Sequence, residues 1–489
     1  MFNHQQDTIS KVALRCFFFF CLAILLALSA CTTPEPKKES SVHSEKIADQ
    51  VRSESRLEPS SEPSPSEQYK TDASSEKGSE PSTPDTSPMD RKPPEQTPEP
   101  SRETTPDAPV LSKKHQAVLK AAEGEFKKQK LVGLGIALVK SGRIVLSKGW
   151  GWADRENKIP VQPAKTLFRW ASISKTLAGV VAVQLSQEKK LDLNQNIEML
   201  LKGYKAPSDW VAPCKAGQTR NYRNKTYTCK SGLYTFPLEP SERVLTSAQL
   251  LSHQGGIAHY TNGKGNPTPP SSKANDPKTN TGLLWAVQGY LYNKPLVAIP
   301  GTKYSYTTFG FNLLGVVLES ASSTSFADLV QQRISVPAKA TTLQPDYEWK
   351  TIPNRAVGYY RSSTSGNIFR QGSSDVSWKL PGGGFLSSVE DLGRYCGALH
   401  DESLLSDAAK KLAWTRQKLK NGNSTSYGLG FGVSTRNGRR RISHSGSQQK
   451  AKTLMLYYPD DNVCFVLMSN STYADVWKLG YAMEDAWRK

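Results

Sequence analysis

The chain has 489 residues, a net charge of +19 and seven cysteines. This length exceeds the usual ~100–200 residues of one domain, so it leaves room for further segments. Seven cysteines are too few for a fold held mainly by disulfides, and their spacing does not match a metal site. No nucleic-acid-binding motif accompanies the positive charge.

The first 30 residues are typical of an export leader. Lys11 and Arg15 form a basic start, and the apolar run 16–28 is shorter than the ~20 residues that span a bilayer. The sequence Leu-Ser-Ala-Cys that ends at Cys31 resembles the bacterial lipoprotein cleavage box. This resemblance implies a lipidated Cys31 as the mature N-terminus and a membrane anchor. An uncleaved anchor is the alternative, and both place the remaining chain outside the cytoplasm.

Residues 31–111 are predicted to be a disordered tether. Pro, Ser, Thr and Glu dominate this stretch, which cannot bury enough apolar surface to offset the entropy of ordering it. As a flexible coil it would span about 50 Å. Thr32 and Thr33 follow the cysteine directly, a pattern that implies outer-membrane sorting in Gram-negative lipoproteins. We therefore expect an exported lipoprotein that faces the periplasm.

A helix and two strands are predicted next. Residues 113–130 have the apolar spacing of an amphipathic helix. Residues 131–139 and 143–149 read as strands joined by a tight turn at Ser141-Gly142. The globular part of the chain is therefore expected to begin at residue 112.

Ser172 and Lys175 form a Ser-x-x-Lys motif where an extended apolar segment becomes a helix that is apolar nearly all round. Such a helix is expected in the middle of a domain. Ser172 would lie in its first turn, where free N–H groups and the helix dipole favour a developing negative charge. Lys175 lies one turn further on the same face. A partly desolvated lysine near other cations can lose its proton and act as a base.

A long region of helices and polar loops is predicted between about residues 191 and 378. Cys214 and Cys229 flank a polar segment rich in turn formers, and in an oxidising compartment we expect them to close a hairpin-like insertion as a disulfide. His253 is expected to brace a helix end. The glycines at 382–384 predict a backbone turn near the site. No metal site and no cofactor are expected.

The C-terminal part returns to strands. They are predicted over 441–447, 452–458 and 462–469, and a final helix over 473–487. A turn at Asn437-Gly438 leads into the strand that carries His444. Cys396 and Cys464 lie in apolar contexts and are expected to be buried free thiols. Strands at both ends predict an α/β protein of the α+β type, in which one antiparallel sheet built from both termini is flanked by helices and carries a mostly helical insert.

Residues 112–489 are expected to form this one domain, and they carry most of the positive charge. Without the acidic tether their net charge is near +25. Such a charge favours attraction to anionic surfaces such as wall polymers, lipopolysaccharide or phospholipid headgroups. A basic soluble protein with no such partner is the alternative.

Five ordered segments resemble the β-lactamase-related serine hydrolases of the penicillin-binding-protein-like fold. These segments are 172–175, 250–257, 300–310, 382–392 and 444–446. The family includes class C β-lactamases, D-alanyl-D-alanine carboxypeptidases, related esterases and the mitochondrial β-lactamase-like serine protease. The resemblance covers essentially all of residues 112–489.

The resemblance implies a role for each motif residue. Ser172 matches the acylated nucleophile, and Lys175 matches the general base or its partner. Tyr306 matches the tyrosine that relays protons to the leaving group and then helps to activate water. His444 stands where many members have a lysine, and is expected to orient a substrate carboxylate or carbonyl. If protonated, it would add a positive charge beside Tyr306. The backbone N–H groups of Ser172 and Ser447 are expected to form the oxyanion hole.

Two departures from the family pattern bear on the substrate. Thr308 replaces the asparagine that β-lactamases usually have, and His444 replaces lysine, so the pattern favours an esterase or peptidase over antibiotic hydrolysis. Gly446 and Ser447 are expected to border the substrate. We expect a lipid-anchored, extracytoplasmic serine hydrolase that cleaves an amide or ester in a small molecule or peptide, such as a cell-wall peptide. A β-lactamase and a catalytically idle cell-wall-binding scaffold are the alternatives.

Overall fold

The computed structural model describes most of the chain beyond residue 110. The described residues are 111–259, 283, 287–288, 291, 294–372 and 374–489. All of them belong to one compact unit, Ser61–Lys489. The predicted leader and, apart from Leu111, the predicted tether lie outside the described residues.

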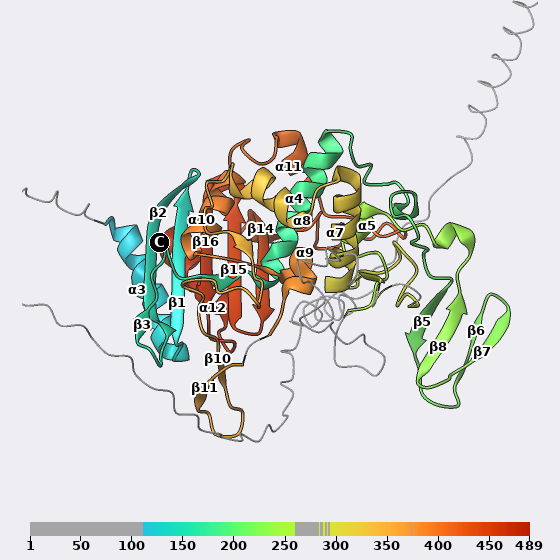
Figure 1. The fold of residues 1–489 in the computed structure, drawn as a ribbon, viewed down its shortest axis with the longest axis horizontal. Coiled ribbons are helices and arrows are strands. Elements are labelled where there is room, and N and C mark those ends of the chain that lie inside the picture. The colour runs from blue at the N-terminus through green and yellow to red at the C-terminus, as the bar shows by residue number, and fades with distance from the viewer. Residues whose placement is uncertain (1–110, 260–282, 284–286, 289–290, 292–293, 373) are drawn as a thin grey trace, which may run out of the picture. The chain divides into compact units, whose positions relative to one another are not determined.

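A seven-stranded antiparallel sheet organises the domain, with strand order β13-β14-β15-β16-β1-β2-β3 (Figure 1). The strands are β1 (Gly133–Lys140), β2 (Arg143–Asp154), β3 (Ile159–Pro160), β13 (Gly432–Arg436), β14 (Arg439–Gln448), β15 (Ala451–Tyr458) and β16 (Val463–Ser469). The first strand pairs with the last one, since Ala137 lies opposite Val466. This pairing confirms the prediction of one sheet built from both ends of the domain.

Both faces of the central strands are buried, and their residues alternate between two cores. In β1, Leu134, Ile136 and Leu138 belong to one core, whereas Ala137 and Val139 belong to the other. Successive side chains of a strand point to opposite faces, so a strand that is apolar throughout must be covered on both sides.

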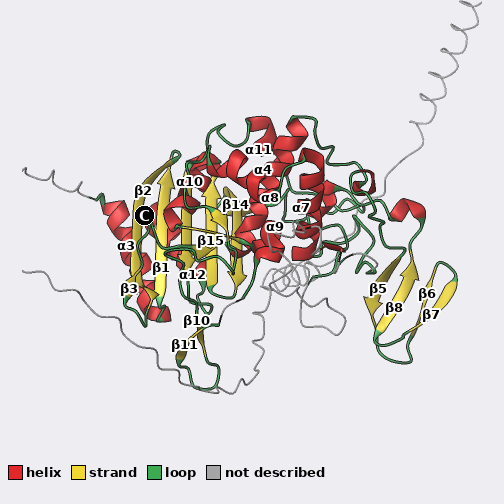
Figure 2. Ribbon diagram, in the orientation of Figure 1, coloured by secondary structure: helices red, strands yellow, loops and turns green. Residues whose placement is uncertain are grey.

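Two helices cover one face of the sheet. They are α3 (Lys113–Gln129) and α12 (Val476–Arg488), which supply Val118, Leu479 and Met483 to the core between helices and strands (Figure 2). The Ser112 hydroxyl accepts from the His115 N–H and caps α3. The predicted terminal helices are confirmed to within a few residues.

The other face carries the predominantly helical part of the domain. Its helices are α4 (Ser174–Gln187), α5 (Ser247–Leu251), α7 (Thr308–Ser322), α8 (Phe326–Val330), α9 (Leu380–Gly383), α10 (Val389–Ala398) and α11 (Asp407–Ala413). Short helical turns accompany them: η1 (Ala171–Ile173), η2 (Ile197–Met199), η3 (Pro240–Glu242), η5 (Gln331–Ser335), η6 (Ser377–Lys379) and η7 (Pro459–Asp461). Eleven residues of α4 are buried, as the sequence predicts for a central helix.

Smaller sheets link these layers. A three-stranded sheet joins β4 (Phe168–Arg169), β12 (Phe385–Ser387) and β9 (Gln344–Pro345), and β10 (Tyr359–Arg361) pairs with β11 (Ile368–Arg370). The remaining pairs are β5 (Asp209–Pro213) with β8 (Leu233–Pro237), and β6 (Thr219–Tyr222) with β7 (Lys225–Thr228). The sheet that contains β4 positions the chain just before Ser172.

The insertion around β5 to β8 has a small core of its own. Trp210, Tyr222 and Phe236 pack together, with ring centroids 4.8–5.9 Å apart. A disulfide joins Cys214 to Cys229 and encloses the β6–β7 hairpin. The predicted disulfide and its hairpin-like insertion are therefore confirmed.

A second disulfide joins Cys396 to Cys464, so the prediction of two free thiols is wrong. Both residues are buried, as their apolar contexts indicate. Cys396 lies on the buried face of α10, and Cys464 lies on the face of β16 that shares the same core. The pairing depends on how α10 crosses the sheet, which the local sequence does not specify.

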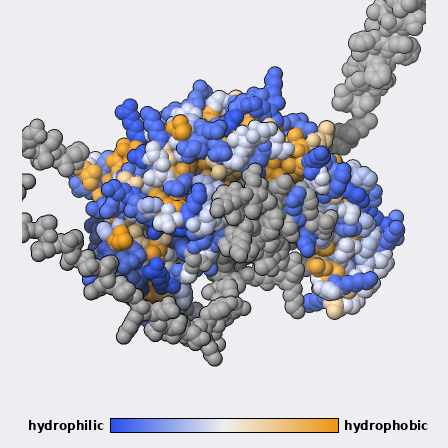
Figure 3. Space-filling model, in the orientation of Figure 1, coloured by the Kyte–Doolittle hydropathy of each residue, from blue (hydrophilic) through white to orange (hydrophobic). Residues whose placement is uncertain are grey.

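The described surface is predominantly hydrophilic on the face drawn in Figure 3, where apolar residues appear mainly as scattered patches. No single helix of the described residues has both the length and the apolar composition to cross a membrane; one bent pair, Thr308–Ser322 with Phe326–Ser335, meets that test by length and composition.

Candidate active site

Ser172 lies in η1, the single helical turn between β4 and α4. The residue before it, Ala171, has φ +49°, a conformation that costs a non-glycine residue energy and is often found at functional sites. Trp170 fixes this turn, because its carbonyl accepts from Thr453 Oγ1 at 2.9 Å and its indole N–H donates to Ser387 Oγ at 2.7 Å. Ser172 thus lies in a short helical turn that leads directly into the buried helix α4, close to the predicted first turn.

Lys175 is fully buried, and its amine contacts three oxygens. Nζ lies 3.0 Å from Ser172 Oγ, 3.2 Å from Thr308 Oγ1 and 2.7 Å from the Gly382 carbonyl. The glycines predicted to form a turn near the site do lie there, within the short helix α9. The carbonyl can only accept, so the amine donates to Gly382, and the two hydroxyls can donate or accept.

Burial lowers the pKa of Lys175 well below its usual value, and the charge of Lys379 lowers it further. A neutral amine has two N–H donors and one lone pair. Donation to Gly382 and Thr308 leaves the lone pair facing the Ser172 hydroxyl. The geometry therefore suits Lys175 as a base that accepts the proton of Ser172.

Tyr306 directly precedes the N-terminal cap of α7 and lies among imidazoles and Lys175. Its ring centroid lies 4.9 Å from Lys175 Nζ, 4.2 Å from the His253 ring and 6.5 Å from the His444 ring. Nδ1 of His253 accepts from the Thr307 N–H at 3.1 Å, which confirms that His253 braces a helix end. These contacts place the phenol beside the Ser172–Lys175 pair.

His259 is a neighbour of the site that the sequence analysis missed. Its Nδ1 accepts from the Thr308 N–H at 3.1 Å, and its ring lies 5.9 Å from that of Tyr306. Burial lowers the pKa of His259 to about 3, and the charges of Lys175 and Lys379 add to this shift. Its position six residues after His253 was the available signal, but only the fold shows that both imidazoles accept from the start of α7.

His444 is buried, and both of its ring nitrogens are occupied. Nδ1 donates to the Ser445 carbonyl at 2.7 Å, and Nε2 lies 2.7 Å from the Tyr427 hydroxyl. Burial and the nearby Lys175 lower the pKa of His444 to about 3. The hydrogen bond to the Ser445 carbonyl opposes this shift only in part. We therefore expect a neutral His444 near pH 7, so it does not add the positive charge beside Tyr306 that a protonated imidazole would add. The reason is that a charged imidazole buried here would lose its hydration and lie near the Lys175 amine, which is energetically unfavourable.

Tyr427 is the second site residue that the sequence analysis missed. Burial raises its pKa well above the usual value, with Tyr306 and Tyr304 adding to the shift. The phenol therefore keeps its proton and donates to Nε2 of His444, which has a lone pair in the neutral tautomer. No local motif marks Tyr427, because it lies before β13 and reaches His444 through its bridge to Gly432 and the pairing of β13 with β14.

Gly446 brings β14 close to the chain around Ser172. A methyl group at Gly446 would overlap the Trp170 carbonyl and Thr453 Oγ1, and would approach Ala171 Cβ within 3.0 Å. The pairing of β14 with β13 ends at Ser443, so residues 444–448 have β15 on one side only. Ser447 lies in this segment with its backbone in an edge position, as a role in the oxyanion hole requires.

The structure thus brings together Ser172, Lys175, Tyr306, Thr308 and His444, and it places Gly446 beside the Ser172 turn. Cys214 and Cys229 lie in the insertion, and Cys31 is outside the described residues. Within the described ranges, no group of three or more His, Cys, Asp or Glu side chains could hold a metal ion. A nucleophile, a base with a lowered pKa and a phenol beside that base are the groups that acyl transfer requires.

Comparisons with known proteins agree with this arrangement. A family model described as Beta-lactamase matches residues 118–485. The human mitochondrial serine beta-lactamase-like protein LACTB is 25% identical over 387 residues, which cover 67% of this chain and 69% of that protein. The octameric penicillin-binding protein homologue from Pyrococcus abyssi matches with a TM-score of 0.58 and 21% identity, over 76% of this chain and 77% of that one. The beta-lactamase/D-alanine carboxypeptidase from Yersinia pestis, solved with citrate, matches with a TM-score of 0.55 and 19% identity, over 76% and 97%.

Proposed function

The chain belongs to the beta-lactamase family and is a serine hydrolase, and on that premise we propose that Ser172 forms an acyl-enzyme with an amide or ester substrate. The observation that carries the proposal is the buried Lys175 amine 3.0 Å from Ser172 Oγ. The predicted family and its mixed fold with a large antiparallel sheet are confirmed.

In the acylation step, Lys175 accepts the Ser172 proton while Oγ attacks the substrate carbonyl. The carbonyl oxygen gains negative charge, and the backbone N–H groups of Ser172 and Ser447 are the proposed donors to it. When the bond to the leaving group breaks, Tyr306 gives it a proton. Water then attacks the acyl-enzyme and gives a proton to the Tyr306 phenolate, and the Lys175 ammonium returns a proton to Ser172 Oγ as the acyl bond breaks.

The neutral state of His444 supports a substrate with an uncharged leaving group. A lysine at this position would offer a positive charge to a carboxylate, whereas His444 offers none and has both nitrogens occupied. Thr308 contacts Lys175 and lacks the carboxamide that could hold a lactam amide. Esters and peptides are therefore favoured over β-lactams, and a cell-wall peptide remains a proposed natural substrate.

Intact mass spectrometry after exposure to a fluorophosphonate and, separately, to a penicillin tests the proposal. A single phosphonate adduct that is lost in Ser172→Ala identifies the nucleophile. A persistent penicillin adduct indicates the carboxypeptidase type, and a transient one indicates lactam hydrolysis. If folded wild-type protein takes up neither reagent, the hydrolase proposal fails and the alternative of an idle wall-binding scaffold gains support.

Cys31 is the proposed lipid attachment site, with the enzyme acting outside the cytoplasm and facing the periplasm from the outer membrane. The leader-like residues 1–30 support this location. The Cys214–Cys229 and Cys396–Cys464 disulfides support it too, since such bonds persist in oxidising compartments. Cys31→Ser should move the protein from the membrane fraction to the soluble fraction and remove the mass of the lipid. Unchanged fractionation would contradict the proposed anchor.

A further inference from the structure

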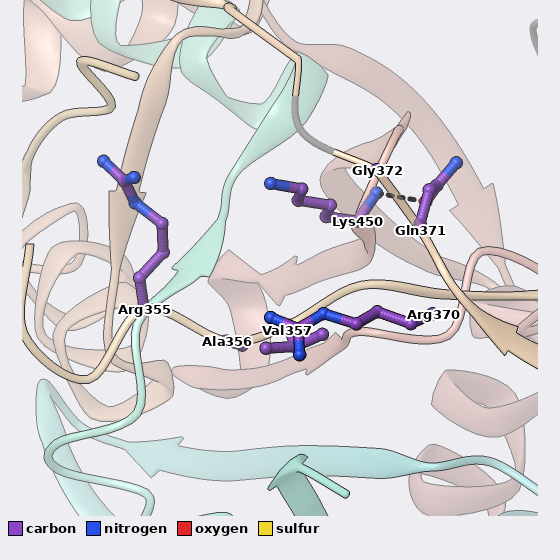
Figure 4. A pocket seen from close by; sticks show the side chains of 7 residues that line it. All are labelled: Arg355, Ala356, Val357, Arg370, Gln371, Gly372 and Lys450. Atoms are coloured by element: carbon purple, nitrogen blue, oxygen red, sulfur yellow. Dashed lines mark hydrogen bonds between the residues drawn. The ribbon is translucent and has the colours of Figure 1, made fainter. Parts of the chain in front are cut away.

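A pocket of about 420 Å³ lies next to the turn between β14 and β15. Its lining residues are Arg355, Ala356, Val357, Arg370, Gln371, Gly372 and Lys450. The side chains of Arg355, Arg370 and Lys450 border the same space (Figure 4). We call this pocket the cationic pocket, because three of its seven lining residues are basic and none is acidic.

The nearby carboxylates already form ion pairs with Arg169, which is buried, and with Arg355, which lines the pocket. Asp346 lies 2.8 Å from the Arg355 guanidinium and 2.5 Å from that of Arg169. Glu348 lies 3.5 Å from Arg169. Arg370 is exposed, and its side chain forms no ion pair with any described residue. Four cations therefore face two carboxylates, which leaves the region positive and suited to a further anion.

Lys450 is held in place by the backbone around the pocket. It has φ +69°, its N–H donates to Gln371 Oε1 at 2.9 Å, and its side chain packs against Gly358, where a methyl group would not fit. Burial and Arg169 lower the pKa of Lys450, and Glu348 and Asp346 oppose that shift only in part. An anion in the pocket would therefore be favoured by a cation that is partly desolvated and fixed in position.

The cationic pocket connects to the active site through β14 and through Arg169. Lys450 follows Ser447 by three residues, in the turn that comes directly after β14. Arg169 precedes Ser172 by three residues, and its Nη1 lies 3.5 Å from the Gln449 carbonyl. At the opposite end of the exposed β14 segment, His444 neighbours Tyr306. Tyr306 protonates the leaving group, so the pocket lies toward the acyl side of the substrate.

We propose that the cationic pocket binds a carboxylate carried by the acyl side of the substrate. The inference rests on the proposed acyl transfer at Ser172 and adds a substrate class to it. The enzyme would favour acyl groups that carry a carboxylate on the side of the turn between β14 and β15. The leaving group would remain uncharged, because His444 is neutral.

Two aryl esters with the same leaving group test this inference. One has an acyl chain that ends in a carboxylate, and the other has an acyl chain of the same length that ends in a methyl group. At constant ionic strength, wild type should favour the carboxylate ester in kcat/KM. Arg370→Gln should reduce that preference by about tenfold, the loss expected for one charged hydrogen bond, mainly through KM. Arg143→Gln, at an exposed position on β2, should leave the preference unchanged.

An equal effect of Arg370→Gln on both esters, or no effect on either, would overturn the inference. If wild type hydrolyses neither ester, the proposed function fails, and titration calorimetry with glutarate then examines the pocket alone. Glutarate binding that is lost in Arg370→Gln would support a carboxylate site. Glutarate binding without any preference between the esters would mean that the pocket holds a free anion, which contradicts the acyl-side assignment. Absence of glutarate binding would remove the site altogether.

Discussion

At the scale of single residues, the proposed chemistry depends most on Lys175. Its amine is buried against three oxygens, and burial lowers its pKa well below the usual value. The Ser-x-x-Lys spacing predicted this pair only together with the apolar helix that follows Ser172, in which residues one turn apart share a face. The partners of His444 could not be predicted, because Tyr427 reaches it from another segment and burial, which the sequence does not show, keeps it neutral.

Gly446→Ala should be destabilising and should impair activity. The added methyl group would overlap the Trp170 carbonyl and Thr453 Oγ1, and so displace the turn that holds Ser172. We expect a loss of about 1–3 kcal/mol in the free energy of unfolding, the usual cost of overpacking. Urea denaturation measures it. The matched control is Gly124→Ala in α3, where a methyl group meets no atom within 4 Å and should not destabilise. Equal stability of both variants would contradict the close packing at Gly446.

The buried histidines predict that stability falls as the pH is lowered from 6.5 toward 3. The folded-state pKa of His444 is about 3, below the unfolded value near 6.5, so the unfolded chain binds more protons in this window. Each such group contributes a slope of up to about 1.4 kcal/mol per pH unit. His444→Gln should make the dependence shallower, measured as urea midpoints between pH 4 and 7. His115→Gln on α3 is the control, and an unchanged slope in His444→Gln would refute a neutral His444.

At the scale of elements, the two disulfides differ in what they hold together. Cys396–Cys464 joins α10 to β16 across the main core, whereas Cys214–Cys229 closes a loop inside the insertion. Apolar alternation in the strands and helical spacing predicted most elements near the sheet, because both patterns are local. The crossing of α10 over β16 is a tertiary contact, which explains why the Cys396–Cys464 disulfide could not be predicted.

Replacing Cys396 and Cys464 by alanine should lower the free energy of unfolding by about 2–4 kcal/mol, since the bond closes a long loop. Replacing Cys214 and Cys229 should instead expose the insertion to proteolysis while leaving the main unfolding transition in place. Calorimetry and limited proteolysis of the two double variants measure these effects. If replacing Cys214 and Cys229 lowered the global stability more than replacing Cys396 and Cys464, these separate roles of the two disulfides would be contradicted.

At the scale of the whole molecule, a basic hydrolase domain is predicted to follow an acidic tether. The domain carries a net charge near +25, whereas residues 31–111 are acidic and rich in proline. Composition predicted this boundary because a stretch with few apolar residues cannot form a core. The relation between tether, membrane and substrate depends on partners outside the chain, and no sequence pattern specifies them.

Limited proteolysis of the full chain should therefore leave a resistant fragment that begins near residue 112 and retains hydrolase activity. The reason is that α3 packs on the sheet with α12, which protects the chain from this residue onward. The fragment is identified by mass and N-terminal sequencing. A resistant fragment that begins well before residue 100 would contradict the predicted tether.

The pH dependence of Ser172 labelling tests most directly the claim that a neutral Lys175 activates Ser172. The measurement is the second-order rate of phosphonate adduct formation from pH 5 to 10, in wild type and in Lys175→Met. Because burial lowers the pKa of Lys175, the wild-type rate should reach its plateau well below pH 10.5 and fall toward acidic pH, where the amine is protonated. Lys175→Met should lose about 10²–10⁴-fold in rate and also lose this pH dependence. A wild-type rate that still rises up to pH 10, or a Lys175→Met rate equal to wild type, would contradict the account.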